Sequence, residues 1–128
     1  MIKLFYKNKN NIFHSKTQFH VQEPFFSLIS AGIKTVEGRL NRRPFSDLKT
    51  NDVVFWFNGE QRVKTTIIRK TVYDSFQLYI EAEGMCKCLP NQEITTIQQG
   101  VDIYRKFYSV EDEKTHGVLA IQIQLEEE

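Results

Sequence analysis

A two-stranded hairpin near the middle of the chain constrains the fold more than any other feature. Residues 53–57 read Val-Val-Phe-Trp-Phe, a continuous apolar run typical of a strand that is buried on both faces. Asn58 and Gly59 follow as a strong turn signal, and residues 61–72 are rich in Thr, Val and Ile. The sequence therefore predicts an antiparallel hairpin at the centre of a sheet.

The segments on either side of the hairpin alternate between strand and helix patterns without a repeat. We expect strands at residues 1–6, at 119–125 and starting at 20–22, and helices that begin at about Pro24 and cover 76–83 and 94–108. Because regular β-α-β alternation is missing, the pattern argues against a doubly wound sheet. It favours an α+β fold, a small mixed barrel of five or six strands with about three flanking helices.

A charged segment follows the first predicted helix. Residues 32–41, Gly-Ile-Lys-Thr-Val-Glu-Gly-Arg-Leu-Asn, predict a helix end, a turn and a short strand. In that strand Val36 and Leu40 point to one side and Glu37 and Arg39 to the other. Since apolar side chains face the core, we expect Glu37 and Arg39 to share a face that packing leaves open. The segment therefore has the character of a site.

Charge and length narrow the class of protein. The 17 Lys and Arg residues nearly balance the 16 Asp and Glu residues, for a formal net charge of +1, which excludes a histone-like binder. Basic residues concentrate over residues 34–70, so an anion site must be local.

We expect one domain over residues 1–128, with a polar loop or arm at 7–16. No apolar run approaches the roughly 18 residues of a membrane span, and no signal peptide is evident, so we expect a soluble, intracellular protein.

The cysteine and histidine pattern argues against a metal site. Cys86 and Cys88 form a single Cys-x-Cys pair, whereas a structural metal usually needs four ligands, and the three histidines are scattered. We therefore expect two reduced thiols and neither a metal nor another cofactor.

Residues 32–39 resemble the Gly-x-Lys-x-x-Glu-x-Arg signature of the ASCH domain (activating-signal-cointegrator homology), a member of the PUA-like superfamily. Further segments resemble the family in the same order: 23–26, 51–55 (with Asn51 in place of the usual glycine), 72–76, 89–90, 104–108 and 117–121. Together they cover about residues 19–125.

The resemblance implies a PUA-like β-barrel with a cleft lined by the signature residues and an association with RNA. Some small members are similar to amidohydrolases that act on acetylated cytidine and use the signature lysine, here Lys34, in catalysis. Those hydrolases carry threonine where this chain has Glu37. They also use a glutamate on the helix after the central hairpin, a position that Glu81 and Glu83 both fit.

Each charged candidate has a structural and a functional interpretation. Lys34 is either a solvated turn lysine or a phosphate contact, and if desolvated it can act as a base or nucleophile. Glu37 and Arg39 form either a structural ion pair or a site in which Glu37 accepts from a base edge and Arg39 binds phosphate. Arg42 and Arg43 are either a solvated pair or contacts to a nucleic-acid backbone.

The aromatic candidates are read in the same way. Tyr73, Phe76, Tyr104 and Tyr108 have packing as their default role, and one of them would line the cleft and stack on a base. Ser75 is expected to cap the N-terminus of the helix over residues 76–83. The predicted ligand-binding set is Lys34, Glu37, Arg39, Arg42, Arg43, Tyr73 and Ser75.

The sequence thus predicts a module that binds RNA or a nucleotide-like ligand in a basic cleft. The alternative is a small amidohydrolase acting on an acetylated cytidine-type nucleoside, with Lys34 and Glu37 catalytic. ASCH domains in coactivator assemblies also allow a protein partner, and the oligomeric state is left open.

Overall fold

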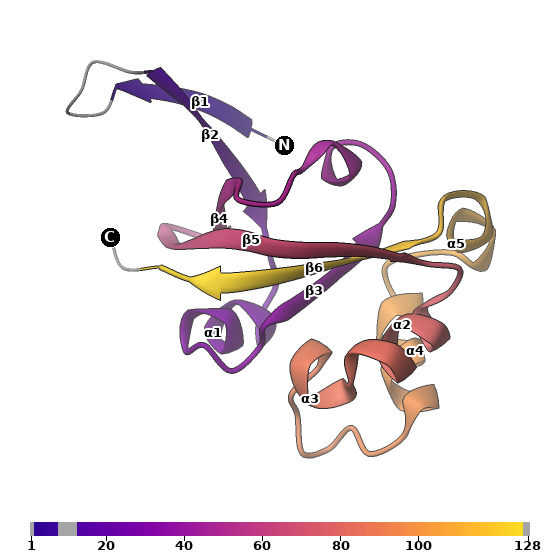
Figure 1. The fold of residues 1–128 in the computed structure, drawn as a ribbon. Coiled ribbons are helices and arrows are strands. Elements are labelled where there is room, and N and C mark those ends of the chain that lie inside the picture. The colour runs from indigo at the N-terminus through magenta and orange to yellow at the C-terminus, as the bar shows by residue number, and fades with distance from the viewer. Residues whose placement is uncertain (1, 8–12, 127–128) are drawn as a thin grey trace.

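The protein forms one curled sheet with helices packed on parts of both faces (Figure 1). The computed structural model describes residues 2–7 and 13–126. Six strands lie in the order β1-β2-β4-β5-β6-β3. Their bounds are β1 Ile2–Lys7, β2 Phe13–His20, β3 Val36–Leu40, β4 Val53–Asn58, β5 Gln61–Tyr73 and β6 Val118–Leu125. β2 and β4 pair in parallel and the other described neighbours are antiparallel. The α+β class and the strand number are confirmed.

The central hairpin is present as predicted. β4 and β5 pair from Val53 opposite Thr66 to Asn58 opposite Gln61. The two residues that connect them are Gly59 and Glu60, and Gly59 has φ 60°. This positive φ explains why a glycine follows Asn58. Both faces of β4 are buried, as the continuous apolar run predicts.

Five α-helices are described where the sequence predicts about three. They are α1 Phe25–Ser30, α2 Phe76–Glu83, α3 Met85–Cys88, α4 Ile97–Arg105 and α5 Val110–His116, with one 3-10 turn, η1 Phe45–Asp47. α2 has the predicted bounds because Ser75 caps its N-terminus and Gly84, with φ 93°, ends it. α4 is shorter than the predicted segment 94–108, since the Thr96 and Gln99 side chains form a capping box at its start.

The amino-terminal part differs from the expectation. Phe13 already begins β2 and pairs with Lys7, so the segment expected to be a polar loop over residues 7–16 contributes to two strands at its ends. β2 therefore starts well before the predicted residues 20–22. Residues 8–12 lie outside the described residues. Figure 1 shows β1 and the start of β2 extending away from the rest of the sheet.

Two hydrophobic clusters hold the fold together, one on each face of the curled sheet. The first lies on the inner side and includes Phe19, Trp56, Ile67, Leu119 and Ile121. The second lies between the sheet and helices α2, α3 and α4, and its members include Val36, Leu40, Phe76, Tyr79, Ile80, Leu89, Val101, Tyr104, Val118 and Ala120. β6 serves both clusters, because its alternating residues point to opposite faces. Its first four residues are buried, so it is not the half-exposed strand that its alternation predicts.

The sheet curls without closing. β3 is its last strand, and the curl brings this edge toward the end of β2. A side chain spans the gap: Arg39 Nη2 donates to the His20 backbone oxygen at 2.9 Å. We call this gap the seam of the sheet. It is the place where three of the predicted site residues meet.

Candidate functional site

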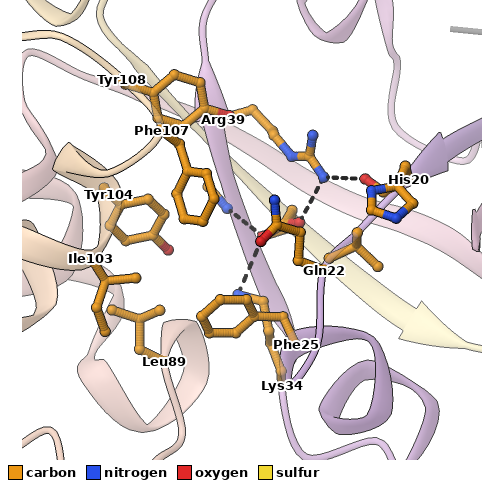
Figure 2. A pocket seen from close by; sticks show the side chains of 13 residues that line it. His20, Gln22, Phe25, Lys34, Arg39, Leu89, Ile103, Tyr104, Phe107 and Tyr108 are labelled. Carbon is orange, nitrogen blue, oxygen red and sulfur yellow. Dashed lines mark hydrogen bonds and ion pairs between the residues drawn. The ribbon is translucent and has the colours of Figure 1, made fainter. Parts of the chain in front are cut away.

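A pocket opens at the seam between β3, the end of β2 and the C-terminal part of α4 (Figure 2). It has a volume of about 130 Å³. Its lining residues are His20, Val21, Gln22, Phe25, Lys34, Glu37, Gly38, Arg39, Leu89, Ile103, Tyr104, Phe107 and Tyr108. We refer to it as the seam pocket. Lys34, Glu37 and Arg39, three of the predicted residues, lie in it together.

Lys34 is a buried cation with a full set of partners. Its side chain comes from the turn before β3 and the residue is only 2% exposed. Nζ donates to the backbone oxygens of Val36, at 2.6 Å, and of Cys88. It also lies 3.4 Å from Glu37 Oε1. An ammonium group has three donors, so these three contacts account for all of them. Lys34 is therefore not a solvated turn lysine, the structural interpretation of this residue.

Glu37 is the counter-ion of this group. The residue is 5% exposed, its Oε2 accepts from Arg39 Nη2 at 3.1 Å, and its Oε1 accepts from the Gly38 backbone N–H at 3.2 Å. Burial by itself would raise the pKa of Glu37, but the charges of Lys34 and Arg39 outweigh it and leave that pKa below its ordinary value. The carboxylate is thus held in its charged, acceptor-only form.

The same contacts satisfy the free edge of the sheet. Glu37 lies opposite Ile121 of β6, so the neighbouring residues of β3 direct their backbone groups to the unpaired side. There the Val36 oxygen accepts from Lys34, and the Gly38 N–H donates to Glu37. An unpaired strand edge normally needs such protection. Lys34 and Glu37 therefore have a structural role as well as a place in the pocket.

Arg39 connects the charged group to the inner aromatic residues. Its guanidinium lies 4.8 Å from the ring centroid of Phe45 and 5.5 Å from that of Trp56. Its side chain is 17% exposed, more than that of Glu37 at 7%. With Lys34 and Arg39 positive and Glu37 negative, these three residues carry one uncompensated positive charge. The pocket therefore suits a ligand with negative charge or an electron-rich edge.

The prediction that Glu37 and Arg39 lie on a face of β3 left open by packing is wrong. Glu37 and Arg39 project to the inner side of the curl, opposite Ile121 and Leu119, and four of the five β3 residues are buried. The alternation of apolar and charged residues along β3 indicates that the strand has two different faces. It does not show that helices cover one of these faces while the curled sheet encloses the other. Charged side chains are tolerated there because each meets an opposite charge or a backbone acceptor.

The other wall of the seam pocket is aromatic. Tyr104, Phe107 and Tyr108 approach from the α4 side, and Figure 2 shows them across from His20. Phe107 is 48% exposed and lines the pocket, so its ring is accessible to a ligand there. Burial raises the pKa of Tyr104 well above its ordinary value, so its hydroxyl stays protonated. That hydroxyl lies 3.1 Å from the hydroxyl of buried Tyr79.

The predicted arginine pair after β3 lies outside the pocket lining. Arg42 is half-exposed and 3.8 Å from Asp112, and its charge acts on the pKa of Tyr108, which burial raises. Arg42 is therefore close to the pocket rim. Arg43 is exposed and pairs with Asp47 at 3.3 Å.

Tyr73 and Ser75 also lie outside the pocket lining. Ser75 accepts from the Leu78 N–H as the cap of α2. The Tyr73 hydroxyl donates to Glu83 Oε2 at 2.5 Å, and Arg69 forks onto both oxygens of the same carboxylate, at 3.0 and 2.6 Å. Glu83 is thus part of a cluster that fastens α2 to β5.

Of the two helix glutamates that the hydrolase resemblance implies, neither lines the seam pocket. Glu83 is engaged as above, and Glu81 is exposed and accepts from Gln77 at 3.1 Å. Within residues 2–7 and 13–126, no group of three or more His, Cys, Asp or Glu side chains is placed to hold a metal ion. No helix in this described part is long and apolar enough to span a membrane.

Sequence reasoning did not identify several pocket residues. The sequence pattern predicts only that His20 starts a strand and that Phe25 lies in the helix beginning at about Pro24, whereas both residues line the pocket. Phe107 gave no signal of its place in the pocket, because it follows Tyr104 by three residues, a spacing that would place both on one face of a longer helix. It is exposed because α4 ends at Arg105, before Phe107.

Comparisons with known proteins show the family and the fold of this chain. A family model described as the ASCH domain matches residues 19–127. The crystal structure of hypothetical protein PH0355 is similar, with a TM-score of 0.79 and 36% identity over 87% of this chain and 99% of that one. The solution NMR structure of protein PF0455 from Pyrococcus furiosus gives a TM-score of 0.73 and 34% identity over 88% and 99%. Among curated proteins, none matches this chain.

Proposed function

Because the chain belongs to the ASCH domain family, as the resemblance of residues 32–39 predicts, we propose that it binds RNA through the seam pocket. In this proposal one base enters the pocket and the adjoining phosphate meets the positive charge at Arg39. The observation that carries it is the half-exposed ring of Phe107 beside a buried cluster with one uncompensated positive charge. Aromatic stacking and cationic contact are the two interactions that single-stranded RNA uses most.

The size of the pocket supports a base-sized ligand. Its volume of about 130 Å³ is smaller than the roughly 300–1,000 Å³ of sites for drug-sized molecules. A single planar ring system suits that space better than a whole nucleotide, so the sugar and phosphate would lie at the mouth. In this proposal Arg42, whose charge partly offsets the rise that burial causes in the pKa of Tyr108, contacts the following phosphate.

The pocket side chains limit which hydrogen-bonding groups a bound base can present. Glu37 is kept ionised and accepts only, and Tyr104 is kept protonated. A base with an N–H donor toward Glu37 and an acceptor toward Tyr104 or Arg39 would complement both. This favours a base over a purely apolar ligand of the same size.

The test is RNA binding by wild type and Arg39→Gln, measured by fluorescence anisotropy with a labelled random-sequence pool of twelve nucleotides. We expect about tenfold weaker binding by the variant and a salt dependence reduced by one phosphate contact, about 0.7 in the log–log slope. Lys114→Gln on α5 removes the same charge from an exposed helix position and serves as the control. Equal binding by wild type and Arg39→Gln would reject the proposal.

One observation favours the hydrolase alternative: Lys34 Nζ lies 3.4 Å from Glu37 Oε1 inside the pocket. A lysine beside a carboxylate in a pocket is a residue pair that general acid–base catalysis uses. Turnover of N4-acetylcytidine by wild type, lost in Glu37→Gln, would establish this function. Absence of turnover with intact RNA binding would leave the binding module alone.

A further inference from the structure

Two rows of side chains cross β2, β4 and β5 on the side of the sheet opposite the inner cluster. His20 pairs with Phe57, and Phe57 pairs with Arg62, so these three residues form one row. The second row consists of Gln18, Phe55 and Lys64. Directly opposite residues of neighbouring strands project to the same side. We call these six residues the strand face.

The strand face is not the part of the sheet that the helices cover. The helix-covered cluster contains residues of β3 and β6, such as Val36, Val118 and Ala120, and no member of the strand face belongs to either core cluster. His20 and Arg62 are exposed, Gln18, Phe57 and Lys64 are half-buried, and Phe55 is buried. Five of the six residues of the strand face are therefore accessible to a partner, and Phe55 is not.

Its composition is aromatic and cationic. The His20 ring meets the Phe57 ring edge-on with centroids 5.5 Å apart, and the Arg62 guanidinium lies 4.6 Å from the Phe55 centroid. Two inter-strand spacings, about 10 Å, separate His20 from Arg62. A half-buried ring beside cations, here Phe57 beside Arg62 and Lys64, is an arrangement that single-stranded nucleic acid binds, through stacking and phosphate contact.

The strand face is continuous with the seam pocket. His20 belongs to both, since it lines the pocket and its backbone oxygen accepts from Arg39. A chain that leaves the pocket past His20 therefore meets Phe57 next and then Arg62. We infer that the strand face binds the nucleotides that adjoin the pocket base in single-stranded RNA, with Phe57 as a stacking surface and Arg62 and Lys64 as phosphate contacts. This inference rests on the proposed RNA-binding function.

An acidic residue, Glu126, lies beside Lys64 and provides a control variant with the opposite expected effect. The Glu126 N–H donates to the Lys64 oxygen at 2.9 Å, and Thr65 pairs with Leu125, so Glu126 lies directly opposite Lys64. Its carboxylate opposes phosphate binding at Lys64. Glu126→Gln should therefore strengthen RNA binding, the reverse of the effect expected from removing Lys64.

The experiment compares two labelled, random-sequence, single-stranded RNA pools, of three and of twelve nucleotides. The short pool reports on the pocket, and the long pool also reports on the strand face. The variants are Arg62→Gln/Lys64→Gln and Phe57→Leu. The control Lys87→Gln/Lys114→Gln removes two charges from exposed positions on α3 and α5. Thermal unfolding of each variant checks that the sheet is intact.

The Arg62→Gln/Lys64→Gln variant should bind the twelve-nucleotide pool about tenfold more weakly than wild type, with a log–log salt slope reduced by about 1.4. Phe57→Leu should weaken the same binding about fivefold without changing the slope, because stacking involves no counterion release. Both variants should bind the three-nucleotide pool like wild type.

The outcomes separate the inference from the proposed function. If both strand-face variants bind the long pool like wild type while Arg39→Gln weakens both pools, the strand-face inference is wrong and the pocket proposal stands. If wild type binds neither pool at low salt, the proposed function fails and the strand-face inference fails with it.

Discussion

Lys34 Nζ and Glu37 Oε1 lie 3.4 Å apart, and both side chains are almost completely removed from solvent. The pair satisfies the unpaired edge of β3 and also lines the seam pocket. Loss of binding in a variant of either residue must therefore be separated from loss of folding.

Lys34→Met should destabilise the protein by about 3–5 kcal/mol, because it leaves the Glu37 carboxylate buried without its main cation and the Val36 and Cys88 oxygens without a donor. Urea unfolding measures the loss. The double variant Lys34→Met/Glu37→Gln should lose less than the sum of the single variants, since the two residues interact. Additive losses would show that the pair is not coupled.

Acid should remove the contribution of Glu37. Its folded-state pKa is lowered from 4.5, so the ionised form stabilises the fold above the unfolded-state pKa, and this contribution is lost as the pH falls through the lower folded-state value. The stability difference between wild type and Glu37→Gln should therefore shrink as the pH is lowered from 7 toward 3. Glu83 also has a lowered pKa, through its hydrogen bonds with Arg69, and titrates in both proteins. A difference that is independent of pH would contradict the assignment.

Gly38→Ala should destabilise the fold by about 1–3 kcal/mol. A Cβ at this position would lie 2.7 Å from atoms of the Tyr79 ring, and Tyr79 is fully buried with no room to move. Chemical denaturation tests this. In a Tyr79→Leu background the same substitution should cost clearly less, whereas an equal cost would show that the strain has another source.

Glu83→Gln should lower stability by about 2 kcal/mol without changing RNA affinity, because the Glu83 carboxylate holds Arg69 and Tyr73 and does not line the seam pocket. Glu81→Gln is the matched control at an exposed position of the same helix, where a change within about 0.5 kcal/mol is expected. A selective loss of binding or turnover in Glu83→Gln, with stability unchanged, would instead support the glutamate role implied by the hydrolase resemblance.

Local signals in the sequence predicted the elements well. The β4–β5 hairpin follows from the apolar run and a glycine at the turn, and the bounds of α2 follow from Ser75 and Gly84. Gly32 has φ 74°, as expected for the residue that ends a helix pattern. Each of these features depends on neighbours in the sequence, which is why propensity and spacing identify them.

The burial of the charged residues could not be predicted in the same way. Lys34 is buried because Cys88, 54 residues further along the chain, supplies an oxygen, and because the curl brings β3 toward β2. Those contacts are tertiary and leave no periodic signal. The motif placed Lys34, Glu37 and Arg39 in one site, but the aromatic residues that complete it come from α1, from α4 and from the turn after α4.

The most direct test of the RNA-binding pocket is the affinity of Phe107→Ala for the twelve-nucleotide RNA pool. Phe107 is 48% exposed, so its removal should leave the thermal unfolding midpoint close to that of wild type. The account predicts binding weakened about fivefold or more, because one stacked base contributes about 1–3 kcal/mol. Wild-type affinity in the folded Phe107→Ala variant would contradict the claim that the seam pocket receives a base.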